Sequence, residues 1–352
     1  MNTNLISPIP EALREQKHIL RFGKNGEFRI LVLSDIHGYP PGPCANTLAA
    51  IKAMVDHEKP DLVLFGGDNI KACESEEQLK EAAGVMVAYL EENRIPWAHV
   101  YGNHDDERYM SEGRRLQTLP RRQQTEVYTT FPYCLSKQGP AHIKGSSNYV
   151  IPIYSSDESR TDPVFNVWGM DSGAYIDDEG LIGKQYVLGN TMYKGRENGD
   201  DPYFTFTQVQ WYFNTSLEIE QYAGHKVPGM MIFHIPLQEF YEAYLNGEKL
   251  GMTGKKREIV CAGPVNSGMF AAMLERGDIK AVCCGHDHIN DYAATFCGIT
   301  LAYVSNVGYE TYHDESMMGG RTLVIREDKP DEVETYMTYI RDLGICFEGD
   351  KK

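Results

Sequence analysis

The sequence predicts an α/β domain built around a largely parallel sheet. Short continuous runs of β-branched and aliphatic residues, typical of strands buried on both faces, alternate with longer amphipathic segments that are typical of helices. The first hundred residues follow the order strand–helix–strand–helix–strand, which implies parallel strands joined by right-handed crossovers. The chain has 352 residues, of which 42% are hydrophobic, so it is long enough to bury a substantial core.

The expected elements follow the chain in order. The first three strands are expected at 28–34, 61–66 and 97–101, with helices between them at 45–57 and 76–93. Two further strands are expected at 147–154 and 163–169, a loop-rich insertion at 176–202, and a helix at 205–222. Strands at 228–235 and 279–284, then antiparallel closing strands within 291–304 and 321–327, complete the order. Because no linker interrupts it, we expect a single domain over residues 1–352 with its core at about 27–327.

The charge balance narrows the choice of partners. The chain has 34 basic and 50 acidic residues, a formal net charge of −16. This balance disfavours nucleic acid as a partner, because binding to its backbone needs clustered lysine and arginine. A site for an anionic substrate would therefore have to create its own local positive field.

Cysteine spacing and hydropathy indicate the cellular compartment in which the protein is expected. The eight cysteines include no C-x-x-C pair, which leaves a zinc ribbon or a thioredoxin-type motif unsupported. The N-terminal residues have no apolar core of the signal-peptide type, and no stretch has the apolar length needed to span a bilayer. We expect a cytoplasmic protein with no membrane partner, or a secreted or periplasmic one if a signal peptide has been removed.

Polar side chains with metal-ligating atoms follow five of the expected strands. In an open α/β sheet, ligands bind beyond the carboxyl ends of the strands, so these side chains are expected to converge. They comprise two carboxylates, one amide and five imidazoles: Asp35, His37, Asp68, Asn103, His104, His234, His286 and His288. Each has an ordinary alternative when taken alone. Asp35 could cap a helix, Gly66–Asn69 could be a plain turn, and His234 could be a core histidine.

The number of these donors favours a pair of metal ions. A single ion needs only three or four ligands, whereas seven or more suit two ions that share one carboxylate. Two ions about 3.5–4 Å apart can clamp the attacking and leaving oxygens of a displacement at phosphorus. They would also supply the positive field that the acidic chain lacks. Gly38 is expected to let the backbone turn sharply beneath the site.

The motifs "SDIHG", "GGDNI", "YGNHDDE", "FHIPLQEF" and "GHDHIND" resemble those of the calcineurin-like metallophosphoesterase superfamily, and in detail its purple-acid-phosphatase-like branch of intracellular phosphatases. The resemblance covers roughly residues 27–327. It implies a four-layer α/β/β/α sandwich with mixed sheets and a dinuclear site at the carboxyl ends of the strands. The implied ligands of one metal are Asp35, His37, Asp68 and His288, and those of the other are Asp68, Asn103, His234 and His286. The implied metals are Fe, Mn or Zn.

The chain differs from true purple acid phosphatases at positions that decide whether a bound iron ion is coloured. Those enzymes have a tyrosine three residues after the bridging aspartate and lack the histidine of the first motif. This chain has Lys71 at the tyrosine position and retains His37. We therefore expect no charge-transfer colour from a tyrosinate bound to iron.

The implied reaction is hydrolysis of a phosphomonoester by a hydroxide that bridges the two metals. The substrate would be a phosphorylated small molecule or a phosphoprotein. His104 is the expected general acid, and Asp105 would orient its imidazole or else cap a helix. The alternatives are a phosphodiesterase acting on a cyclic nucleotide or glycerophosphodiester, and a catalytically silent binding scaffold.

Several other residues are weaker candidates for the site. Asp291 is expected either to accept a hydrogen bond from a ligand imidazole or to be a solvated strand-end residue. The remaining candidates would face the substrate or lie in solvated loops: Tyr39, Lys71, Arg108, Met192 to Arg196, and His313.

Overall fold

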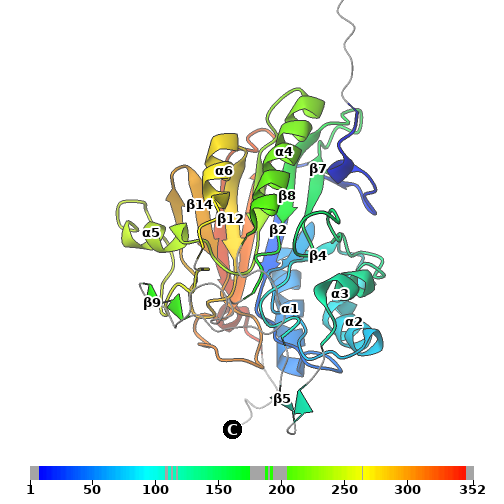
Figure 1. The fold of residues 1–352 in the computed structure, drawn as a ribbon, viewed down its shortest axis with the longest axis vertical. Helices are drawn as coiled ribbons and strands as arrows, with labels where there is room; N and C mark the ends of the chain where they lie inside the picture. The colour runs from blue at the N-terminus through cyan, green and yellow to red at the C-terminus, as the bar shows by residue number, and fades with distance from the viewer. Residues whose placement is uncertain are drawn as a thin grey trace, which may run out of the picture.

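Two mixed β-sheets pack face to face and carry helices on their outer sides in the computed structural model (Figure 1). The structure describes residues 8–107, 118–174, 204–263 and 265–345. It also describes the backbone of two short strand pairs, β5 (Met110–Ser111) with β6 (Arg114–Arg115) and β9 (Val187–Leu188) with β10 (Thr191–Met192). The predicted insertion at 176–202 lies almost entirely outside the described residues, as do Arg108 and Tyr193 to Arg196.

The first sheet has five strands in the order β16-β15-β2-β3-β4. Its strands are β2 (Glu27–Leu33), β3 (Leu62–Phe65), β4 (Trp97–His99), β15 (Gly319–Arg326) and β16 (Val333–Tyr339). Strands β2, β3 and β4 pair in parallel, as the crossover order predicts, whereas β15 is antiparallel to both β2 and β16. The carboxyl ends of the three parallel strands therefore lie at one edge of the sheet.

The second sheet has seven strands in the order β1-β7-β8-β11-β12-β14-β13. Its strands are β1 (Leu20–Arg21), β7 (Tyr149–Tyr154), β8 (Pro163–Gly169), β11 (Gly229–Ile232), β12 (Ile279–Cys284), β13 (Ala293–Phe296) and β14 (Ile299–Tyr303). The central strands β8, β11, β12 and β14 are parallel, so their carboxyl ends also meet at one edge.

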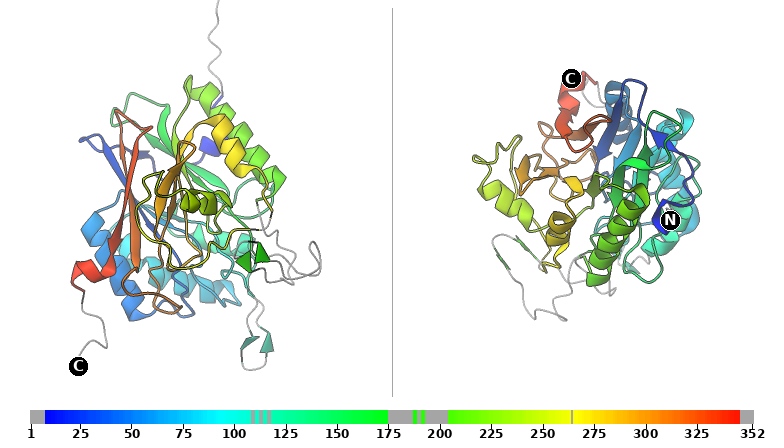
Figure 2. Two further views of the ribbon diagram at one scale, coloured as in Figure 1. Left: turned by 90° about the vertical axis from the view of Figure 1, so that its left-hand side faces the viewer. Right: turned by 90° about the horizontal axis from the view of Figure 1, so that it is seen from above.

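Three hydrophobic cores separate the four layers. Between the sheets, Val32 and Leu64 of the first sheet are buried with Val167 and Ile232 of the second. The outer face of the first sheet packs against α1 (Ala45–Glu58), α2 (Glu76–Glu92) and α3 (Arg121–Tyr128). The outer face of the second packs against α4 (Phe206–Ala223), α5 (Glu239–Leu245) and α6 (Met269–Arg276). Figure 2 shows the two groups of helices on opposite sides of the paired sheets, which is the predicted four-layer sandwich. Two short 3₁₀ helices lie at Glu11–Leu13 and Ile340–Leu343.

Local sequence signals explain where the longer helices begin and end. Ser75 accepts a hydrogen bond from the backbone N–H of Gln78 at the start of α2. Thr205 and Gln208 form a reciprocal capping box at the start of α4, and Gly224 ends that helix in the left-handed conformation. No helix of the described residues is both long and apolar enough to cross a membrane.

The predicted elements are confirmed at most positions, with one difference in the closing strands. The segment 291–304 forms the hairpin β13–β14 at the edge of the second sheet, where β14 is parallel to β12. The segment 321–327 lies in the other sheet, where it forms most of β15 and pairs antiparallel with β2. Local hydrophobic patterns show that these segments are strands, but the choice of sheet depends on contacts between residues distant in the sequence. The sequence did not predict the short elements α3, α5, α6 and β1, or the partly exposed strand β16.

Candidate metal centre

Loops that follow strands of both sheets bring the predicted ligands together. Asp35 and His37 follow β2, Asp68 follows β3, and Asn103 follows β4. His234 follows β11, and His286 and His288 follow β12. These seven side chains are buried, although they are charged or strongly polar. A buried cluster of this kind requires compensation by partners or by a bound ion.

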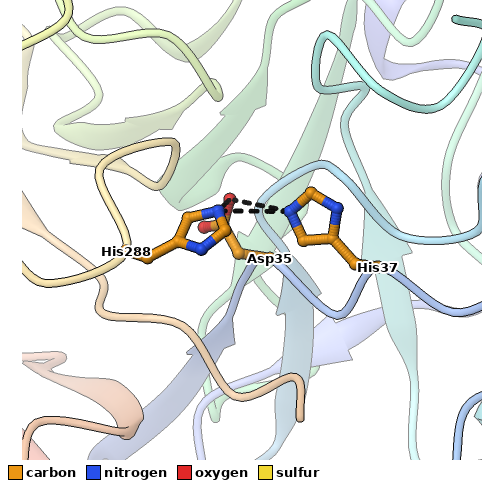
Figure 3. Close-up of side chains that lie close together, drawn as sticks. All are labelled: Asp35, His37 and His288. Atoms are coloured by element: carbon orange, nitrogen blue, oxygen red, sulfur yellow. Dashed lines mark hydrogen bonds and ion pairs between the residues drawn. The ribbon is translucent and has the colours of Figure 1, made fainter. Parts of the chain in front are cut away.

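One group of donors surrounds Asp35 (Figure 3). Its Oδ1 atom lies 3.3 Å from Nε2 of His288 and 4.0 Å from Nε2 of His37. The two Nε2 atoms lie 3.2 Å apart and face each other. Two ring nitrogens at this distance need a proton or a cation between them, and the three side chains can together hold a metal ion.

A second group surrounds Asp68. Its Oδ2 atom lies 3.2 Å from Nε2 of His234 and 3.5 Å from Nε2 of His37. Asp35, Asp68 and His234 form another set of donors close enough to share an ion. Because Oδ2 of Asp68 lies near one histidine of each group, this carboxylate occupies the position expected of a bridging ligand.

His286 and Asn103 complete the predicted set. The ring of His286 lies 5.1 Å from that of His234, measured between centroids. Asn103 is completely buried, and neither its Oδ1 nor its Nδ2 has a hydrogen-bond partner. It follows Gly102, where an added Cβ would lie 2.2 Å from Oδ1 of Asp68, so only glycine lets these two loops approach each other.

The backbone of the site is held in a conformation that L-residues rarely adopt. Asp35, His37, Asp68 and His286 all have positive φ angles, of 55°, 54°, 51° and 73°. Such strain costs of order 1–3 kcal/mol per residue and is concentrated at functional sites. Gly38 does not have a positive φ, but a Cβ added to it would lie 2.7 Å from the side chain of Ile70 and 2.8 Å from that of Pro43. Glycine is therefore needed at this position for close packing beneath the site.

Hydrogen bonds fix the orientation of two imidazoles. His234 donates its Nδ1–H to the carbonyl of Gly66 at 2.9 Å, and His288 donates its Nδ1–H to the carbonyl of Tyr312 at 2.8 Å. A carbonyl can only accept, so the hydrogen is on Nδ1 and the lone pair is on Nε2 in the neutral rings. This is the tautomer that a metal ligand requires. Asp291 binds no ligand imidazole, because its carboxylate accepts from Tyr339 and from the backbone of Lys255. The predicted bond to an imidazole is therefore wrong.

Burial and neighbouring charges shift the pKa values of the clustered side chains in different directions. Burial lowers the pKa of both His37 and His286 to about 3, which keeps their rings neutral. Burial alone would raise the pKa of Asp35, but nearby His288 and His234 outweigh it and lower the pKa to about 2. His234 differs, because the nearby carboxylates of Asp68 and Asp35 outweigh its burial and raise its pKa to about 9. A cation that binds this ring would therefore have to displace a proton from it.

His104 lies at the rim of the cluster, 30% exposed, with its ring 5.1 Å from that of His37. Its Nδ1 pairs with the carboxylate of Glu107, and its backbone N–H donates to Oδ1 of Asp68 at 2.7 Å. The predicted role of Asp105 as the partner of His104 is wrong, since the Asp105 carboxylate accepts backbone N–H groups instead. Sequence reasoning missed Glu107, although its spacing of three residues from His104 is a signal that could have found it.

Of the weaker candidates, the structure places Lys71 and Tyr39 beside the site, whereas His313 has other contacts. Lys71 lies with Nζ 3.2 Å from Nδ1 of His37 and 4.5 Å from the ring centre of Tyr39, so both residues border the site. The imidazole of His313 instead contacts the backbone carbonyl of Thr311 and the ring of Tyr309.

The proposed ligands fit a pair of metal ions because several of their polar atoms are buried without enough protein partners. Both polar side-chain atoms of Asn103 are buried without a hydrogen-bond partner, and Oδ2 of Asp68 and Nε2 of His234 face each other at 3.2 Å. Leaving a buried polar atom unpaired costs about 1–3 kcal/mol, so their concentration at one point requires an explanation. Coordination of a cation by the carboxylate, the imidazole and the amide oxygen would satisfy the acceptor atoms of this group together.

Comparison with known proteins agrees with this geometry. Residues 28–290 match the family model described as calcineurin-like phosphoesterase. An Arabidopsis thaliana protein named probable inactive purple acid phosphatase 29 is 30% identical over 336 residues, which cover 87% of this chain and 78% of that protein. Phosphatase DCR2 of Saccharomyces cerevisiae is 31% identical over 76% of this chain and 45% of its own length.

A solved structure shows the same fold at low sequence identity. A dimetal phosphatase from Danio rerio is 12% identical, with a TM-score of 0.50 over 88% of this chain and 98% of that one. The two-sheet fold and its strand-end cluster define a metallophosphoesterase type of protein. The chain belongs to the calcineurin-like phosphoesterase family.

Proposed function

We propose that this protein is a metal-dependent phosphomonoesterase that acts on a phosphorylated small molecule or a phosphoprotein. The observation that carries the proposal is the buried cluster of carboxylates, imidazoles and an amide with unsatisfied ligand atoms, bordered by the His104–Glu107 pair. A scaffold that only bound a partner would have no need for these unsatisfied polar atoms at the centre of the fold.

The proposed metal ligands fall into two sets that share Asp68. Asp35, His37 and His288 would hold one ion with Asp68, and Asn103, His234 and His286 would hold the other. When bound, two cations such as Fe, Mn or Zn would lower the pKa of water and neutralise charge that develops on the phosphoryl group.

The chain itself would supply the proton for the leaving oxygen. His104 is partly exposed at the rim, where a substrate can reach it, whereas the proposed ligands are buried. Glu107 holds Nδ1, so Nε2 is the nitrogen from which a proton would pass to the ester oxygen.

A comparison of two chromogenic esters tests the proposal. Protein loaded in turn with Mn, Fe or Zn is assayed with p-nitrophenyl phosphate and with bis-p-nitrophenyl phosphate, and its metal content is measured. We expect turnover of the monoester in preference to the diester, and its loss in Asp68→Asn. A preference for the diester would instead identify a phosphodiesterase acting on a cyclic nucleotide or glycerophosphodiester.

The name of the Arabidopsis relative makes the inactive scaffold a specific second candidate, because it describes that protein as probably inactive. Metal-replete protein that hydrolysed neither ester, nor any of a broad panel of phosphomonoesters, would contradict the proposed activity and favour the scaffold.

A further inference from the structure

Two exposed tyrosines border the candidate metal centre. Tyr312 is 56% exposed and Tyr39 is 39% exposed, whereas most tyrosines of the described cores are buried. Tyr312 belongs to the loop between β14 and β15, and Tyr39 follows His37 by two residues. Single exposed aromatic residues are common on protein surfaces. Tyr312 contacts the proposed ligand His288 directly, and Tyr39 contacts Lys71, which in turn contacts the proposed ligand His37.

Tyr312 is fixed to His288 by several interactions. Its ring stacks on the imidazole with a centroid distance of 4.1 Å and an interplanar angle of 9°. Its hydroxyl donates to Oε2 of Glu258 at 2.8 Å, and its backbone carbonyl accepts from Nδ1 of His288. Because His288 covers one face of the ring, the exposed area belongs to the other face and the edges. The ring is therefore a rigid aromatic surface beside the centre.

Tyr39 borders the neighbouring ligand. Nζ of Lys71 lies 4.5 Å from the centre of the Tyr39 ring and 3.2 Å from Nδ1 of His37. The rings of His37 and His288 are 4.9 Å apart. A continuous series of contacts thus runs from Tyr39 through Lys71, His37 and His288 to Tyr312. The two tyrosines thus lie at the ends of this series, with the proposed ligands His37 and His288 between them.

We propose that these two rings bind a planar aromatic group of the substrate, so that the preferred phosphomonoester is one that carries such a group. This inference rests on the proposed phosphomonoesterase function and names its substrate class. A ring held in place loses little conformational entropy when a second ring stacks on it, so a fixed tyrosine is a favourable platform. Two sources share this chemistry, aryl phosphates such as phosphotyrosine and nucleoside monophosphates.

A different role for Tyr312 has to be separated from this one. Its ring and carbonyl could serve only to position His288, in which case removing the ring would affect every substrate and inhibitor equally. An aromatic platform instead makes the effect depend on whether the bound molecule has a ring. The ratio of two affinities distinguishes these roles, because a general loss of metal or of orientation cancels in it.

The test measures binding of phenylphosphonate and methylphosphonate to metal-loaded protein by calorimetry and by competitive inhibition. Neither compound is hydrolysed, so leaving-group reactivity does not enter. We expect tighter binding of phenylphosphonate, and a fall of about 3- to 10-fold in the phenyl-to-methyl affinity ratio in Tyr312→Leu and in Tyr39→Leu. Tyr312→Phe keeps the ring and should keep the ratio. Tyr336→Leu, which removes a tyrosine of similar exposure on β16, is the matched control and should also keep it.

The outcomes separate the two proposals. If wild type and Tyr312→Leu have the same phenyl-to-methyl affinity ratio, the aromatic site is overturned. If the protein also hydrolyses phosphomonoesters, the proposed phosphatase function is unaffected by that result. Absence of turnover with any phosphomonoester would instead overturn the function on which it rests. Comparison of kcat/KM for phosphotyrosine and for adenosine monophosphate then identifies the source, because only the variant-sensitive substrate uses the tyrosine rings.

Discussion

The carboxylate of Asp105 accepts a hydrogen bond from the backbone N–H of Asp68 at 2.9 Å. It also accepts from Asn69 at 2.8 Å and from Gly102 at 2.7 Å, so it joins the loops that follow β3 and β4. Burial, with the nearby charge of Asp68, raises the pKa of Asp105 to about 7. Asp105 therefore shapes the loops that carry Asp68 and Asn103, and Glu107 is the acid that contacts His104.

We predict that Asp105→Asn destabilises the protein. The amide would turn its NH₂ group towards backbone N–H donors and leave at least one of them unsatisfied, at a cost of about 1–3 kcal/mol. Urea unfolding of metal-free protein measures this loss. Glu107→Gln is the control, since Glu107 is about one-third exposed and its replacement should change the free energy of unfolding by less than about 0.5 kcal/mol. Equal stability of wild type and Asp105→Asn would contradict the structural role.

Catalysis should depend on His104 and, to a smaller extent, on Glu107. His104→Asn should lower kcat about 100-fold or more while metal content stays at the wild-type level, because the proton donor is lost and the proposed ligands are retained. Glu107→Gln should give a smaller loss of kcat. Steady-state kinetics and elemental analysis of each variant check this prediction. Loss of metal from His104→Asn would show that His104 is a ligand and not an acid.

The strand ends could be predicted from the sequence because each is marked locally, by an apolar run followed by glycine, carboxylate or imidazole. This local signal predicts that Asp35, Asp68, His234 and His286 lie at one site. The partners of these residues could not be predicted in the same way. The stacking of Tyr312 on His288 and the burial of Asp105 depend on loops that meet only after folding.

Lys71 provides a spectroscopic prediction. The purple colour of true purple acid phosphatases comes from a tyrosinate bound to iron, and this chain has Lys71 at that position. Iron-loaded wild-type protein should show no such visible band. Lys71→Tyr should introduce it, since Nζ of Lys71 lies 3.2 Å from the imidazole of His37. Lys71→Met, which has no phenol, should remain colourless. A charge-transfer band in the wild type would mean that another tyrosine binds the metal.

Metal binding should stabilise the fold. The proposed ligands are brought together only in the folded chain, so an ion at 100 times its dissociation constant should add about 2.7 kcal/mol to the free energy of unfolding. Thermal unfolding with Mn or Zn, compared with protein treated with a chelator, measures the shift in Tm. Asp68→Asn should lose most of it because Asp68 is the proposed bridging ligand. An unchanged Tm for wild type on addition of every metal tested would count against the centre.

Arg321 of β15 joins the two sheets behind the site. It is 2% exposed, and its Nε and Nη2 atoms each donate at 2.7 Å, to the carbonyls of Tyr303 and Asp291. Lysine has a single ammonium and cannot reproduce this fork, so one buried carbonyl would lose its partner. We expect Arg321→Lys to lower the free energy of unfolding by about 1–3 kcal/mol in urea titrations. Arg326→Lys, on the same strand but exposed and paired with Glu27, should cost less than about 0.5 kcal/mol. If both variants unfolded at the same urea concentration as wild type, Arg321 would contribute no more to the stability of the sandwich than a surface ion pair does.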